Sequence, residues 1–125
     1  MTKIKLPSLT PEQDAEFDRQ VKVWQTKLNL QDWRIERASR PAVAAMATVK
    51  VNYGARLASY RTGPGWPTAT KQDIEATVVH ELLHVLLAEL THLTASEASA
   101  DVLESAEHRV VNTLEKLLMK TTGAR

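Results

Sequence analysis

The first part of the chain carries an apolar stripe at helical spacing. The stripe consists of Phe17, Val21, Trp24 and Leu28. Side chains at i, i+4, i+7 and i+11 share one face of an α-helix, so the pattern predicts a helix over residues 11–28 whose apolar face packs on the core. Thr10 is a suitable N-cap, Pro11 suits the first helical position, and Gln13 completes a capping box.

Between residues 32 and 61 the pattern changes to an alternation of apolar and polar side chains. This alternation is typical of strands with one buried face. It predicts strands over residues 32–37, 45–51 and 56–61, with residues 52–54 as the turn of a hairpin between the last two. Residues 62–70 contain two glycines and two prolines and are expected to form a loop.

The second half of the chain is predicted to be helical, over residues 73–90 and 96–119. The link of residues 91–95 is short, so these two helices should pack antiparallel. We therefore expect an α+β fold in one domain over residues 1–125. It would contain an N-terminal helix, a small sheet of about three strands that includes a hairpin, and two packed helices.

Composition excludes several classes of protein. The chain has 125 residues, 43% of them hydrophobic, and no cysteine. It therefore has no disulfide framework, no thiolate nucleophile and no cysteine-ligated metal site. No apolar run approaches the ~18 residues of a membrane span, and no apolar stretch follows the first lysines as it does in a secretory signal. We expect a cytoplasmic protein without a membrane partner.

The charges are distributed unevenly. Residues 1–71 carry 12 Lys and Arg against 6 Asp and Glu, whereas residues 72–125 carry 4 against 9. A basic half can bind a polyanion, or its surface can simply attract the acidic half of the same fold. The basic side chains on the predicted strands and loops are Arg34, Arg37, Arg40, Lys50, Arg56 and Arg61.

One motif carries chemistry, and it lies in the predicted helix over residues 73–90. It reads His80-Glu81-Leu82-Leu83-His84. The two histidines are one helical turn apart and project from one face, at the spacing that lets a zinc ion take a nitrogen from each. Glu81 points about 100° round the helix, where a carboxylate can take a proton from water activated by the metal. This is the H-E-x-x-H pattern of metallopeptidases.

A catalytic zinc site needs a third protein ligand, which the last predicted helix would supply. Its candidates are Glu97, Asp101, Glu104, Glu107 and His108. The predicted apolar face of that helix is formed by Ala100, Leu103, Val110, Leu114 and Leu117, with Val111 and Leu118 at its edge. Glu107 falls in the middle of this face, Glu104 at its margin, and the other three candidates on or near the opposite side.

Antiparallel packing places the two histidines opposite about residue 104, which admits both Glu104 and Glu107. A lone carboxylate in the middle of a core-facing stripe calls for a buried cationic partner, so burial favours Glu107.

The motif and the order of elements resemble a small zincin of the gluzincin type. Residues 33–118 are similar to short metallopeptidases encoded by phages and prophages, although only the H-E-x-x-H part is specific. The resemblance implies a zinc site of His80, His84 and Glu107, with Glu81 as general base. It also implies that the strand at Leu57 to Tyr60 lines the cleft and pairs with an extended peptide.

The sequence departs from the larger relatives in two ways. Larger gluzincins place the glutamate ligand about as far after the second histidine as Glu104 lies here. The chain also lacks an obvious counterpart of their auxiliary His or Tyr, for which Tyr60 and His108 are the substitutes. His92 lies off the predicted zinc face and is expected at the surface.

Three functions remain for comparison with the structure. The leading hypothesis is a zinc-dependent metallopeptidase that hydrolyses a peptide or protein substrate, with Glu81 as base. The alternative is a non-catalytic zinc-binding module, in which Glu104 beside Glu107 closes the site as a fourth ligand. Nucleic-acid association through the basic half is compatible with the first, since SprT-like metallopeptidases, which resemble this architecture, act on DNA-bound proteins; no aromatic-interleaved basic motif supports it.

Overall fold

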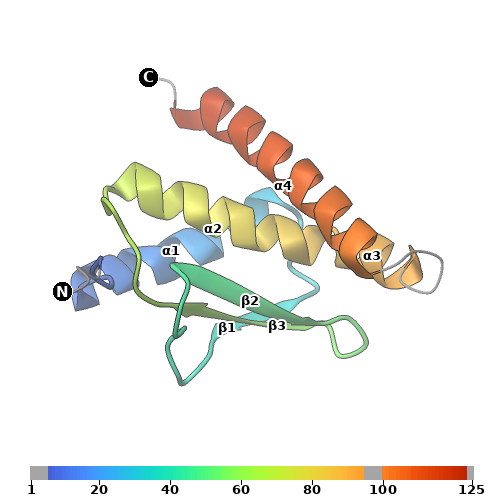
Figure 1. Ribbon diagram of the computed structural model, residues 1–125, viewed down its shortest axis with the longest axis horizontal. Helices are drawn as coiled ribbons and strands as arrows, with labels where there is room; N and C mark the ends of the chain where they lie inside the picture. Colours follow the sequence, from blue (N-terminus) through green and yellow to red (C-terminus); the bar gives the residue numbers. More distant parts are fainter. Residues whose placement is uncertain (1–5, 95–99, 124–125) are drawn as a thin grey trace.

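The computed structural model describes residues 6–94 and 100–123 (Figure 1). Its elements are α1 (Pro11–Lys27), β1 (Arg34–Arg37), β2 (Ala47–Asn52), β3 (Leu57–Thr62), α2 (Lys71–Leu86), α3 (Ala88–Thr94) and α4 (Ala100–Gly123). The α+β class, the N-terminal helix, the small sheet and the helical C-terminal part are as the sequence predicts. Figure 1 shows α1 and α2 on one face of the sheet, with α4 running back across α2 in roughly the opposite direction.

The sheet has the order β1-β3-β2. β1 pairs with β3 in parallel, and β2 pairs with β3 antiparallel as a hairpin. The predicted turn at residues 52–54 is displaced, because Asn52 pairs with Leu57 and residues 53–56 connect the two strands. β3 is therefore the central strand, with neighbours on both edges, and cannot pair with a further peptide. The expectation that Leu57 to Tyr60 does so is wrong, and β2 is the edge strand on the side that faces α2 and α4.

The core lies between the sheet and the first two helices. The predicted stripe of α1 is largely buried at Phe17, Val21 and Trp24. α2 buries Ile74, Val78, Val79, Leu82, Leu83 and Val85. Because α2 packs against α1, β2 and α4, it is apolar on most sides, and any ionisable side chain on it must find a partner.

Both boundaries of α2 differ from the prediction, and α4 continues to Gly123 instead of ending at residue 119. α2 begins at Lys71 because Thr70 caps it: the Thr70 hydroxyl accepts from the Asp73 backbone N–H, and the Asp73 carboxylate accepts from the Thr70 N–H in return. α2 then ends at Leu86, and the short helix α3 takes up most of the link that the sequence predicts at residues 91–95. The predicted start of the last helix, with Glu97, lies outside the described residues.

The buried face of α4 is rotated from the predicted one. Val111, expected at the edge of the apolar face, is fully buried, whereas Val110 and Leu117 are 43% and 56% exposed. Because α4 contacts mainly α2, only one narrow face of α4 is covered. The apolar periodicity of α4 alone does not show which of its faces that is. None of the described helices is both long and apolar enough to span a membrane.

We expect Gly63→Ala to destabilise the fold. A Cβ atom at Gly63 would lie 2.5 Å from the carbonyl oxygens of Ala42 and Ala45, and these backbone atoms cannot swing away as a flexible side chain would. Overpacking of this kind costs about 1–3 kcal/mol in free energy of unfolding. Urea denaturation measures it, with Gly54→Ala as the matched control, because the nearest atom to a Cβ there is a side-chain oxygen at 3.7 Å. Equal stability of the two variants would contradict the packing described here.

The cap of α2 should make stability sensitive to acid. Hydrogen bonds from the Thr68 hydroxyl and from the Thr70 N–H hold the pKa of Asp73 below its ordinary value of 3.8. A carboxyl with a lowered folded-state pKa contributes stability above its unfolded pKa and loses it as the pH falls through the folded value. Asp73→Asn should therefore flatten the fall in unfolding free energy below pH 3.8. Parallel curves for the variant and the wild type would rule this contribution out.

Candidate metal centre

His80 and His84 lie on the side of α2 that faces β2 and α4. Their ring centroids are 5.2 Å apart, and both side chains are partly buried. The apolar residues on the other faces of α2 hold this helix in the core. The relative position of the two rings is therefore set by the helix and not by a loop. The predicted pairing of these two histidines on one helical face is confirmed.

His108, from α4, joins them. One ring nitrogen from each of His80, His84 and His108 lies within 4.8 Å of the other two, and these three form the one such group of potential ligands among the described residues. The ring of His108 is 5.1 Å from that of His84 and 6.2 Å from that of His80. The expectation that His108 lies on the side of the last helix opposite the site is wrong, because the contact face of α4 is rotated toward it.

Two carboxylates of α4 are hydrogen-bonded to Nδ1 of the two α2 histidines. Glu107 is hydrogen-bonded to Nδ1 of His84, and Glu115 is hydrogen-bonded to Nδ1 of His80 at 2.8 Å. A carboxylate that accepts from Nδ1–H fixes the tautomer in which Nε2 carries the lone pair. In this arrangement Nε2 of both α2 histidines is the nitrogen available to a metal ion, and the carboxylates orient the rings.

Glu107 therefore lies at the site, as the sequence predicts, and its role as a direct ligand stays a prediction. Glu104 is exposed and lines a neighbouring cavity with Tyr53 and His92. His92 is exposed, as expected, and its ring stacks on that of Tyr53. Sequence reasoning missed Glu115. Its signal is its position two turns after Glu107, on the same face of α4.

Glu81 is almost completely buried beside the histidines, with 8% of its surface exposed. Its Oε2 lies 4.0 Å from Nε2 of His80. Burial raises the pKa of Glu81 to about 7, with Glu115 adding to the rise and His80 opposing it. The hydrogen bond to Glu115 raises the pKa of His80, although burial opposes this. The carboxyl that the sequence predicts as the base thus has a pKa near neutrality.

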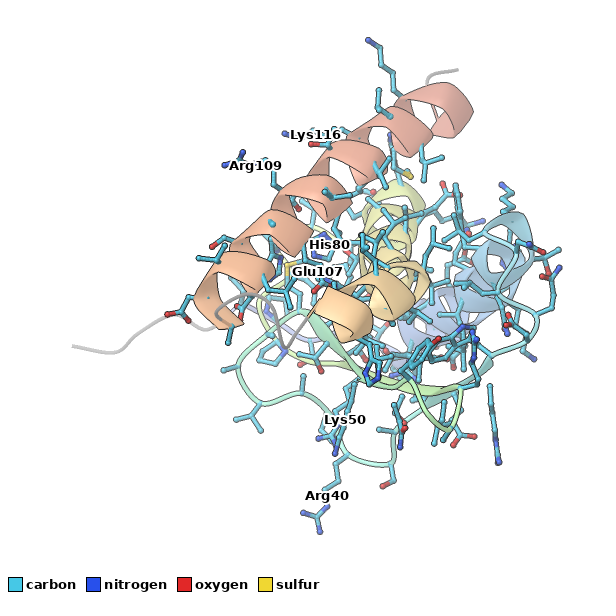
Figure 2. The ribbon with its side chains drawn as sticks, turned by 90° about the vertical axis from the view of Figure 1, so that its right-hand side faces the viewer. Arg40, Lys50, His80, Glu107, Arg109 and Lys116 are labelled. Carbon is cyan, nitrogen blue, oxygen red and sulfur yellow. The ribbon has the colours of Figure 1, made fainter. Side chains whose placement is uncertain are left out.

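A cavity of about 490 Å³ opens in front of these groups. Its walls are β2 on one side, α2 behind and α4 on the other, and Figure 2 shows His80 and Glu107 close together between the two helices. Its lining includes Ala47, Val49, Glu81 and His108. Tyr60 does not line it, because its hydroxyl donates to Asp18 of α1 at 2.7 Å. Of the two candidates for an auxiliary residue, His108 alone lines the cavity, and it does so as a member of the three-histidine group.

The side chains present fit a zinc ion by their chemistry. Three imidazoles, two of them with a carboxylate on Nδ1, form a donor set that borderline-soft divalent metals favour, and cysteine is not needed. The same donors also accept other first-row divalent metals, since geometry and availability decide between them.

Comparisons of the chain with protein-family models, with curated proteins and with solved structures found no match. The functional assignment therefore rests on the geometry and chemistry of this site.

Single substitutions on α4 should identify the third ligand. We expect His108→Ala to lower zinc affinity most, because it removes a nitrogen from the three-histidine group. Glu107→Ala and Glu115→Ala should each lower affinity by about 10–100-fold, as is typical for a carboxylate that orients a histidine ligand. Glu104→Ala is the matched control and should have no effect. Competition with a chromophoric zinc chelator measures all four.

The opposite ranking of the losses in zinc affinity would change the assignment of the third ligand. If Glu107→Ala abolished zinc binding while His108→Ala bound zinc like the wild type, Glu107 would be the direct ligand, as the sequence predicts.

Proposed function

We propose that this chain is a zinc-dependent metallopeptidase. The observation that carries the proposal is the buried Glu81 at the back of an open cavity, with its Oε2 4.0 Å from Nε2 of His80, a member of the three-histidine group. A group of histidines alone would suit a structural metal site. A buried carboxyl beside them that faces an open cavity is the feature that catalysis needs, whereas a structural metal site has no use for it.

The side chains have distinct roles in the proposed reaction. His80, His84 and a third ligand from α4 would hold the zinc ion. When bound, zinc polarises a substrate carbonyl and lowers the pKa of water. Glu81 takes a proton from the attacking water and delivers it to the leaving amine. Glu107 and Glu115 hold the histidine rings in place through Nδ1, and the burial of α2 keeps Glu81 away from bulk water.

The edge strand β2 supports a peptide as the substrate. It forms one wall of the cavity, and its outer edge carries backbone groups that the sheet does not use. An extended peptide that adds to this edge gains main-chain hydrogen bonds and passes in front of the histidines. This replaces the β3 strand, which the sequence favours for the same role.

The alternative is a zinc-binding module without turnover. One observation favours it: Glu107 lines the same cavity as the three histidines, so a further protein side chain that can bind a metal is present there. A closed site would leave no position for water. The two proposals differ in what they require of Glu81, which a closed structural site does not use.

Glu81→Gln separates them. We expect the variant to bind zinc like the wild type and to lose about 10²–10⁴-fold in the rate of peptide cleavage, the usual contribution of a general base. The assay uses zinc-loaded protein and a library of fluorogenic peptides, with exposed Glu36→Gln as the control. Cleavage by Glu81→Gln at the wild-type rate would contradict the role of Glu81. Failure of the zinc-loaded wild type to cleave any peptide would favour the binding module.

A further inference from the structure

The edge strand β2 has a cavity on each of its faces. The cavity on the inner face contains the histidines. The cavity on the outer face measures about 460 Å³ and is lined by Ala42, Val43, Ala44, Ala45, Thr48, Val49, Lys50 and Arg61. Figure 2 shows Lys50 and Arg40 on the side of the sheet away from His80 and Glu107. A strand added to the edge of β2 would therefore present alternate side chains to two different cavities.

The outer cavity is cationic. Lys50 and Arg61 are near neighbours across the hairpin, since Thr48 faces Arg61 and Lys50 faces Ser59 in the register of β2 and β3. No acidic side chain lines this cavity, and no ion pair joins Lys50, Arg61 or the nearby Arg40 to any residue of the described chain. Within residues 6–94 and 100–123, these two cations beside an apolar loop thus have no acidic partner.

Three of the six basic side chains on the predicted strands and loops form ion pairs. Arg34 pairs with Glu36, and Arg56 pairs with Asp32. Arg37 pairs with both Asp14 and Asp18. Half of the six cations that suggest a nucleic-acid surface in the sequence are therefore in ion pairs with carboxylates of the same chain. The remaining three are few beside the roughly 6–10 phosphate contacts of a typical salt-sensitive nucleic-acid complex, whereas they match a single acidic side chain.

We propose that the outer cavity, through Lys50 and Arg61, selects a substrate with an aspartate or glutamate in the segment that adds to β2. This rests on the proposed peptidase function and specifies its substrate class. Side chains directly opposite each other on neighbouring strands interact, and opposite charges in that position stabilise the pairing. The inner-face residues Ala47, Val49 and Val51 are small or apolar and carry no charge to compete.

The geometry also limits where the acidic residue lies. Ala47 lines both cavities that contain His80 and Glu81, so the scissile bond lies near Ala47. Lys50 is three residues further along β2, or about 10 Å at the rise of a strand. The acidic residue should therefore stand two to four positions from the scissile bond. The direction in which the peptide runs decides whether it precedes or follows that bond.

Binding to the zinc-loaded Glu81→Gln variant tests the proposal without depending on turnover. The probes are fluorescent peptides that differ only in having Glu, Gln or Lys at positions two to four on either side of a central residue, read by anisotropy. We expect Glu to be favoured over Gln by about two- to tenfold at one position, with Lys the weakest, in line with exposed charge pairs. Lys50→Glu with Arg61→Glu should reverse the order, so that Lys is preferred.

The matched control is Arg109→Glu with Lys116→Glu, which changes the net charge equally on the outer side of α4 (Figure 2). It should keep the preference for Glu. The proposal is overturned if no peptide binds, if Glu and Gln peptides bind equally, or if the preference survives reversal of Lys50 and Arg61. The proposal is also overturned, in favour of a nucleic-acid surface, if no peptide preference is found and the wild type shows salt-sensitive retention on duplex DNA that the Lys50→Glu, Arg61→Glu variant loses.

These outcomes are distinct from failure of the proposed function. If the wild type cleaves no peptide while Glu81→Gln binds acidic peptides through Lys50 and Arg61, the specificity stands and the peptidase does not. If cleavage is found without an acidic preference, the peptidase stands and the specificity does not.

Discussion

The burial of α2 is the constraint on which the rest of the structure depends. The helix packs its apolar side chains against α1 and the sheet, and it also carries His80, Glu81 and His84. Ionisable groups on such a helix are costly unless they are paired or bind a metal. α4 provides the partners, because its inner face carries Glu107, His108 and Glu115. The packing of α4 across α2 is thus both the completion of the core and the assembly of the candidate site.

The sheet contributes through its edges. Because β3 is central and pairs on both sides, the one strand beside the cavity that can accept another chain is β2. The loop that closes against Gly63 shapes the far side of this strand, where Lys50 and Arg61 have no acidic partner among the described residues. One short strand therefore separates the candidate metal centre from the proposed site of charge recognition.

The sequence predicts correctly those features of the fold that local interactions determine. The capping box at Thr10 and the stripe from Phe17 to Trp24 determine α1, and the spacing of His80 and His84 determines their shared face. Prediction from the sequence fails for features that tertiary packing determines. Val110 and Val111 are adjacent and alike, so only the crossing of α4 over α2 shows that Val111 is the buried one.

The same crossing brings His108 to the site, which no pattern within α4 specifies. The parallel pairing of β1 with β3, which makes β2 the edge strand, likewise depends on the path of residues 38–46 between strands and not on alternation.

Metal content tests the central claim most directly. Untagged protein, purified without chelators and analysed by elemental mass spectrometry, should contain one zinc ion per chain, and His84→Ala should contain none while its helical circular dichroism is retained. Protein that holds no metal even after incubation with zinc and dialysis would contradict the account. The histidines would then be a hydrogen-bonded group that serves packing alone.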